Sequence, residues 1–162
     1  MIAARPETRA APRRGRAGLL LALAAALALA PAARAAEKAR GAGKAPVKVV
    51  YHLTEGLEEA VRALRNIRNH LDADPGARIV VVTNGAGIDF LLEGAQDKNG
   101  NPFEVTVQDL ASKGVEFRVC EITLKSRNID RKQLIDEVKY VPSGVAEVSR
   151  LQAQEGFVYL KP

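Results

Sequence analysis

The chain has 162 residues, of which 47% are hydrophobic and 27% charged, and its formal net charge is +5. Residues 1–36 hold six of the 24 Lys and Arg but one of the 19 Asp and Glu, so the remainder carries 18 basic and 18 acidic residues. Because the positive excess is confined to this first segment, the charge pattern argues against a nucleic-acid-binding protein.

The first 36 residues are typical of a cleavable signal peptide. Arginines open the chain, residues 18–30 (GLLLALAAALALA) form an apolar run, and Ala33-Arg34-Ala35 supplies the small-x-small pattern of a cleavage site. As a helix the run would rise about 20 Å, too short for a membrane span of about 30 Å, so a retained anchor is the poorer interpretation. We therefore expect a periplasmic or secreted protein with no membrane attachment after cleavage. Sec export is the default, and Arg13-Arg14 leaves the twin-arginine route as the alternative.

One domain is expected to follow. Residues 37–46 (EKARGAGKAP) lack large apolar groups and are predicted to form a flexible tail, so the fold should occupy residues 47–162. The chain has a single cysteine, Cys120, which excludes a disulfide within the chain.

The first half of this domain alternates between strand and helix signals. Residues 48–53 (KVVYHL) suit a buried strand, and apolar residues spaced by three and four from Leu57 to Leu71 predict a helix that ends before Pro75-Gly76. Residues 78–83 (RIVVVT) are apolar on both faces, as in an interior parallel strand. Residues 88–95 are predicted to form a short helix. A turn at residues 96–102 leads to a helix over residues 104–113, in whose apolar stripe Val107 fits least well.

The second half continues the alternation. Residues 115–119 (VEFRV) predict a third strand that delivers Cys120 at its end, followed by a short helix over residues 123–127. Residues 138–141 form a fourth short strand. Ser143 then caps a helix that ends at Gly156, and residues 157–160 form the last strand.

Alternation of this kind predicts a three-layer α/β/α fold with a mostly parallel sheet of about five strands. In such folds, ligands and reactive groups gather outside the carboxyl ends of the strands. Three segments meet that condition here: Tyr51-His52, residues 84–87 and residues 120–123.

From about residue 47 to the end, the sequence resembles the DsrE/DsrF-like family of small sulfur-relay proteins, and more closely its exported members. Three stretches carry the resemblance: YHLTEG with the helix ending RNIRNHL, GVEFRVCEITLKSRNID, and VKYVPSGVAEVSRLQAQEGFVYLKP. In sulfur-relay members a strand ends in a cysteine that is followed by a short helix and an Arg-Gly-Ile/Leu turn. Cys120, Arg127 and Ile129 match this frame, with Asn128 at the glycine position. The resemblance implies a five-stranded parallel sheet, a trimer or hexamer, and a cysteine that carries sulfur as a persulfide, passed between donor and acceptor proteins.

Cys120 is the main candidate for chemistry. A thiol at the end of a strand and the start of a helix lies at the positive end of the helix dipole, which lowers its pKa and favours the reactive thiolate. Lys125 and Arg127 would strengthen this effect, whereas Glu121 would oppose it. The competing interpretation is that Cys120 is a small buried hydrophobic residue, which is how most lone cysteines are used.

Other candidates lie at the same edge. His52 ends the first strand and could act as an acid, a base or a hydrogen-bond donor beside a persulfide, although most such histidines only satisfy a hydrogen bond. An anion or substrate cleft is predicted from a set of residues that includes the turn after the second strand: Asn84, Gly85, Gly87, Thr123 and Arg127. For the turn, a plain tight turn is the alternative. No His, Cys and carboxylate residues have metal-ligand spacing, so neither a metal nor another cofactor is expected.

Two functions remain open at this stage. The leading hypothesis is a sulfur carrier or sensor that uses Cys120, closer to a transfer protein than to a conventional enzyme. The alternative is a non-catalytic oligomeric binding or assembly module in which Cys120 is a packed core residue.

Overall fold

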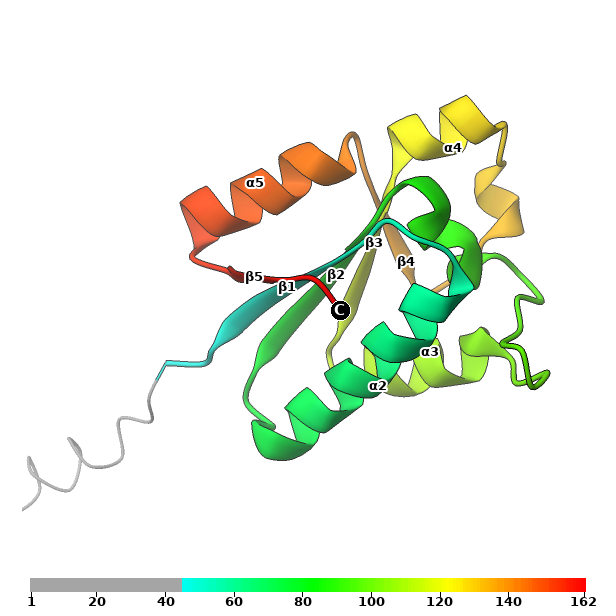
Figure 1. Ribbon diagram of the computed structural model, residues 1–162. Helices are drawn as coiled ribbons and strands as arrows, with labels where there is room; N and C mark the ends of the chain where they lie inside the picture. The colour runs from blue at the N-terminus through cyan, green and yellow to red at the C-terminus, as the bar shows by residue number, and fades with distance from the viewer. Residues whose placement is uncertain (1–44) are drawn as a thin grey trace, which may run out of the picture. The chain divides into compact units, whose positions relative to one another are not determined.

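The computed structural model describes residues 45–162, which form a five-stranded sheet with helices on both faces (Figure 1). All four strand pairings are parallel, and the strand order is β4-β3-β2-β1-β5. The strands are β1 (Lys48–Leu53), β2 (Arg78–Thr83), β3 (Glu116–Cys120), β4 (Val138–Val141) and β5 (Val158–Leu160). The predicted fold class is therefore confirmed. The signal peptide and the tail as far as residue 44 lie outside the described residues.

Helical segments connect the strands. They are α2 (Leu57–Ala73), the 3-10 helix η1 (Gly85–Leu91), α3 (Phe103–Ser112), α4 (Glu121–Arg127), the short 3-10 helix η2 (Arg131–Gln133) and α5 (Gly144–Glu155). None of the helices within residues 45–162 is long and apolar enough to cross a membrane.

The helices divide unequally between the two faces of the sheet. Figure 1 shows α2 and α3 on one face and α5 alone on the other. Strands β1 to β4 follow one another in a single direction across the sheet, whereas the chain returns past β1 to add β5 at the opposite edge. Since parallel crossovers are right-handed, the reversal of direction moves the connecting helix α5 to the other face.

Two hydrophobic clusters reflect this arrangement. The larger one packs α2, η1 and α3 against the sheet and contains Phe90, Phe103 and Phe117, whose rings meet edge to face. The smaller one lies beneath α5 and consists of Val50, Val80, Val82, Val148, Leu151 and Phe157. Full burial of one such aliphatic side chain stabilises the fold by about 1.5–3 kcal/mol, so even the smaller cluster holds α5 firmly on the sheet.

Two local predictions were wrong. Residues 85–91, and not residues 88–95, are helical, and they form a 3-10 helix. Gly87 explains the tight geometry, because a β-carbon there would lie 2.2 Å from the carbonyl oxygen of Leu53. The second error concerns α3, which starts at Phe103 and buries Val107 completely, while Val105 is exposed. The apolar stripe runs through residues 103, 107 and 110. It was missed because the helix was expected to start at residue 104, which left Phe103 out of the stripe.

The topology marks one place at the carboxyl edge of the sheet. The connection after β3 stays on the α2 side, where Leu124 of α4 joins the larger cluster, whereas the connection after β4 leads to α5 on the other face. Neighbouring strands whose connections diverge in this way leave a crevice between them, the position at which open α/β sheets place their ligands. Cys120 is the last residue of β3 and lies at this position.

Candidate functional site

A row of polar side chains crosses the carboxyl edge of the sheet beneath α5. Cys120 pairs with Val141 of β4, and Val119 before it pairs with Thr83, so Asn84 is the next residue on the neighbouring strand. His52 on β1 pairs with Val82, which points to the same face as Asn84 because side chains alternate along a strand. Cys120, Asn84 and His52 therefore follow one another on adjacent strands that lie about 4.8 Å apart.

Hydrogen-bond donors lie near the sulfur of Cys120. Cys120 is the N-cap residue of α4, and the groups that lower the pKa of its thiol are the N–H of Gly144 at the start of α5, the Thr123 hydroxyl, and the N–H groups of Thr123 and Ile122 in the first turn of α4. Burial raises the pKa of the Cys120 thiol, but these four donors outweigh burial and leave the pKa below its ordinary value. The direction of this shift favours the thiolate more than burial alone would, although the side chain is only 5% exposed.

Gly144 brings the two helix starts together. A β-carbon at this position would lie 3.3 Å from the β-carbon of Cys120 and 3.2 Å from that of Asn84. The absence of a side chain thus lets the first N–H groups of α5 approach Cys120 directly. Ser143 begins the helix by accepting a hydrogen bond from the N–H of Ala146, as expected from the sequence.

His52 and Asn84 form a close pair. The Nε2 atom of His52 lies 2.6 Å from the side-chain oxygen of Asn84. Because an amide oxygen only accepts hydrogen bonds, this contact places a proton on Nε2. The ring of Tyr159, from β5, packs edge-on against the His52 ring at a centroid distance of 5.9 Å, with its hydroxyl 3.5 Å from Nδ1. The polar row therefore extends from β5 to β3.

Thr123 and Gly85 border the same site and are joined to each other by a hydrogen bond. The hydroxyl of Thr123 accepts a hydrogen bond of 3.0 Å from the N–H of Gly85, and it is one of the groups that lower the pKa of Cys120. Arg127, by contrast, is turned away from the sulfur. Its guanidinium binds the Asp89 carboxylate at 2.6 Å and the carbonyl of Gly85 at 2.9 Å, which fixes α4 to η1.

Gly87 is also separate from the polar row, since it is buried against the last carbonyl of β1. The structure thus brings together Cys120, Thr123, Asn84, His52 and Gly85 but not Arg127 or Gly87. Two further contributors were not identified from the sequence. The stretch that contains Gly144 was interpreted first as a helix start and only second as a lip of the cleft. Tyr159 lies in the last strand, and its place beside His52 depends on the order of the strands in the sheet.

Arg118 lies on the same face, two residues before Cys120, but its guanidinium is already ion-paired with two carboxylates. It donates to Glu116 at 2.6 Å and forms a close ion pair with Glu147. Burial lowers the pKa of Arg118 less than its bonds to these carboxylates raise it, so it stays a cation within this network. The guanidinium is consequently not available to a ligand beside the sulfur.

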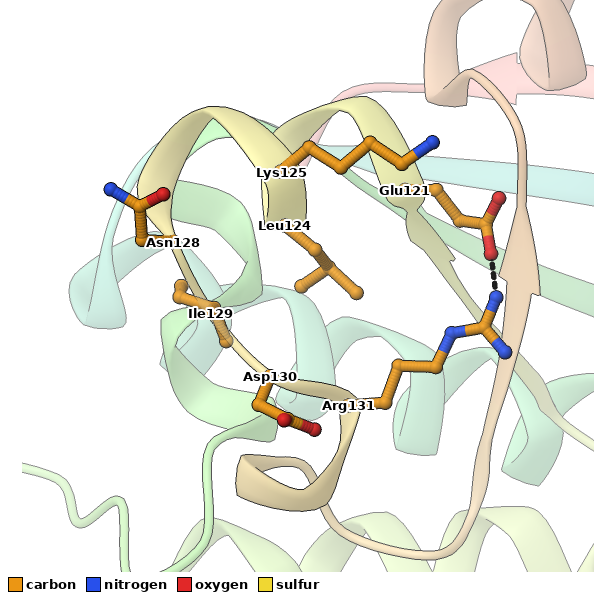
Figure 2. Close-up of a pocket in the computed structure, with 7 residues that line it drawn as sticks. All are labelled: Glu121, Leu124, Lys125, Asn128, Ile129, Asp130 and Arg131. Atoms are coloured by element: carbon orange, nitrogen blue, oxygen red, sulfur yellow. Dashed lines mark hydrogen bonds and ion pairs between the residues drawn. The ribbon is translucent and has the colours of Figure 1, made fainter.

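A hollow of about 700 Å³ lies elsewhere. It is lined by the segment from Glu121 to Arg131, with Leu124 and Ile129 as its apolar part, and neither Cys120 nor the His52–Asn84 pair borders it. Figure 2 shows the carboxylate of Glu121 turned toward Arg131, with which it forms an ion pair. This pairing reduces the opposition that Glu121 was expected to offer to a thiolate at Cys120.

The described part of the chain contains no group of three or more His, Cys, Asp or Glu side chains placed to hold a metal ion. The polar row itself places a cysteine thiol, whose pKa is lowered, beside an amide and an imidazole. A thiolate of this kind is a nucleophile, and electrophilic sulfur is one of its natural targets.

Comparison with known proteins identifies relatives of the whole domain. The solved structure of MTH1491 from Methanobacterium thermoautotrophicum, described as a protein of unknown function, is 30% identical, covers 72% of this chain and 99% of its own, and has a TM-score of 0.64. The YchN protein from E. coli is 15% identical and shares the fold, with a TM-score of 0.56 over 72% of this chain and 100% of its own. No curated protein matches the sequence. The family model described as DsrE/DsrF-like matches residues 8–162, and the chain therefore belongs to the DsrE/DsrF-like family.

Proposed function

We propose that this protein is an exported sulfur carrier that holds sulfane sulfur as a persulfide on Cys120. Membership of the DsrE/DsrF-like family supports a sulfur-relay role at the level of the family. The observation that carries the proposal for this chain is the place of Cys120, at the junction of β3 and α4 and against the start of α5, where neighbouring N–H groups and the Thr123 hydroxyl lower the pKa of the thiol despite its burial.

The proposed step needs no oxidant. The thiolate of Cys120 attacks the terminal sulfur of an inorganic polysulfide, a new S–S bond forms, and the adjacent S–S bond of the polysulfide breaks. The electron pair of the broken bond leaves with a polysulfide that is one sulfur shorter. Cys120 becomes a persulfide anion, and transfer to an acceptor thiolate reverses these changes.

Mass spectrometry of the intact protein tests this step. Incubation of the mature chain with polysulfide should add one sulfur atom, and a reductant such as dithiothreitol should remove it. The Cys120→Ser variant should fold normally and take up no sulfur. A wild-type protein whose thiol gains no sulfur under native conditions, and reacts only after denaturation, would contradict the proposal.

The alternative function is a non-catalytic binding or assembly module. The observation in its favour is the small exposed fraction of Cys120, 5%, which is typical of a packed residue. In that case the Cys120→Ser variant would keep every binding property of the wild type, and alkylation of the native thiol would be slower than that of a free cysteine peptide.

Export and assembly complete the proposal. The Arg-rich start, the Leu/Ala run and Ala33-Arg34-Ala35 support cleavage of the signal peptide, so protein from the native host should begin near Ala36 or Glu37. The family resemblance supports a trimer or hexamer that meets a separate sulfur donor or acceptor. Light scattering of the mature chain should report three or more subunits, and a monomer at micromolar concentration would count against this assembly.

A further inference from the structure

Asn84 is the polar side chain beside Cys120 whose donors are not used within residues 45–162. Its oxygen accepts from Nε2 of His52 at 2.6 Å, and its side-chain nitrogen donates no hydrogen bond to another described residue. Asn84 and Cys120 lie on neighbouring strands, and their β-carbons are both close to Gly144. The two side-chain N–H groups of Asn84 are therefore unused within residues 45–162, on a residue whose β-carbon borders Gly144 together with that of Cys120.

His52 determines which end of the amide is free. The carboxamide of Asn84 has one accepting and one donating end, and a flip by 180° would present its oxygen in place of its N–H groups. The Nε2–H of His52 holds the oxygen, and the edge-on ring of Tyr159 supports the imidazole from the other side. These contacts fix the amide in the orientation that leaves donors for an anion.

Two arginines near this edge are already paired. Arg118 is bound by Glu116 and Glu147, and Arg127 is bound by Asp89. Ile122 and Val145, in the first turns of α4 and α5, are exposed apolar residues. An anionic ligand at the sulfur thus meets neutral N–H donors in a partly apolar setting, where hydrogen bonds to charge are strong.

We propose that the Asn84 amide binds the anionic sulfur that reaches or leaves Cys120, and that His52 and Tyr159 are positioning residues that hold this amide in its donating orientation. The ligand class is an anionic sulfane species, either inorganic polysulfide or the terminal sulfur of the Cys120 persulfide. The identity of this anion rests on the proposed function. The presence of an anion-binding amide beside the thiol does not.

A pair of alkylating reagents isolates the effect of charge. Iodoacetate is an anion and iodoacetamide is neutral, while both react with the same thiolate and have nearly the same size. The readout is the rate constant of iodoacetate with native Cys120 divided by that of iodoacetamide. In Asn84→Leu, which loses both donors, this ratio should fall about tenfold or more, the value of one hydrogen bond to a charged group. Asn84→Asp, which also adds a negative charge, should lower the ratio further.

Variants of His52 test positioning. His52→Gln keeps an N–H donor near the place of Nε2 and should retain the wild-type ratio, whereas His52→Phe removes this donor and should lower it. The matched control is His70→Phe. His70 also contacts a tyrosine, with its Nδ1 3.1 Å from the Tyr51 hydroxyl, but it lies on α2. The control should leave the ratio unchanged.

The outcomes separate the two proposals. In Asn84→Leu, the rate constants of the two reagents could fall by the same factor or stay unchanged. Either result would show that Asn84 only packs beside the thiol and would overturn this inference. A wild type that takes up no sulfur from polysulfide, together with a lowered reagent ratio in Asn84→Leu, would refute the persulfide carrier and leave the anion-binding amide standing. Slower sulfur uptake and a lowered ratio in the same variant would support both.

Discussion

Replacing Thr123 by valine removes one donor from the Cys120 sulfur while keeping the shape of the side chain. Burial raises the pKa of the Cys120 thiol, and the Thr123 hydroxyl is one of the four groups that lower it. A hydrogen bond to a charged group contributes about 1.5–3 kcal/mol, and about 1.4 kcal/mol corresponds to one pKa unit. Since the backbone N–H donors remain, we expect the pKa of Cys120 to rise in Thr123→Val without losing the whole of its lowering.

The same change has a separate effect on stability. The Thr123 hydroxyl accepts the N–H of Gly85 at 3.0 Å, and an unsatisfied N–H in this part-buried position costs about 1–3 kcal/mol. Urea denaturation should show this loss in Thr123→Val. Thr123→Ser keeps the hydroxyl and is the matched control for both effects.

The assay is the pH dependence of the iodoacetamide rate constant in native protein, which reports the thiolate fraction. The midpoint of this profile should move upward in the valine variant and stay near the wild-type value in the serine variant. An unchanged midpoint in Thr123→Val, with the fold intact, would show that the donors near Cys120 do not control the thiol and would refute this account of the site.

Three other predictions concern stability. Gly87→Ala should destabilise the fold by about 3 kcal/mol or more, because its β-carbon would meet backbone at 2.2 Å, whereas Gly76→Ala, with its nearest contact at 3.6 Å, should change the unfolding free energy little. Lys161→Met should destabilise the protein by about 1–2 kcal/mol in urea denaturation at neutral pH, since it leaves the buried Glu59 carboxylate without its cation. Burial raises the pKa of Glu59, but Lys161 and two backbone N–H groups lower it by more, so the folded pKa is below the ordinary value. The difference in unfolding free energy between the wild type and Lys161→Met should therefore disappear as the pH falls below about 4 and Glu59 is protonated. For Cys120, whose folded pKa is lowered, the unfolding free energy of the wild type should rise relative to Cys120→Ser as the pH rises toward the ordinary thiol pKa of about 8.5, and a flat difference would contradict this prediction.

Much of the fold could be predicted because its signals are local. Residues 48–53 and 78–83 occupy strands with the predicted bounds, since their continuous apolar runs fit only a strand covered on both faces. The helix after Ser143 also begins and ends as expected, because Ser143 and Gly156 make the capping contacts that their residue types favour. The segment after β2 was mispredicted because its geometry depends on the close approach of Gly87 to β1, which is not encoded in the local pattern.

The site was harder to predict, because it depends on which strands are neighbours. The sequence placed Cys120, Asn84 and His52 at strand ends, but their order on adjacent strands follows from the arrangement β4-β3-β2-β1-β5. Gly144 and Tyr159 come from segments far along the chain, and each joins the site only because α5 crosses the far face and β5 returns beside β1.

Burial by itself does not decide between a reactive and a packed Cys120. Val141 is the partner of Cys120 in the next strand, points to the same face and is 8% exposed, so it shows what simple packing requires at this edge. Packing is satisfied there by a side chain without any polar atom. Cys120 is buried to a similar degree, yet donors at the starts of α4 and α5 lower the pKa of its thiol. A neutral thiol accepts hydrogen bonds only weakly, whereas a thiolate accepts them strongly, so these donors fit the charged form of the residue. The distinction between the two functions therefore lies in the titration of Cys120 and not in its exposed area.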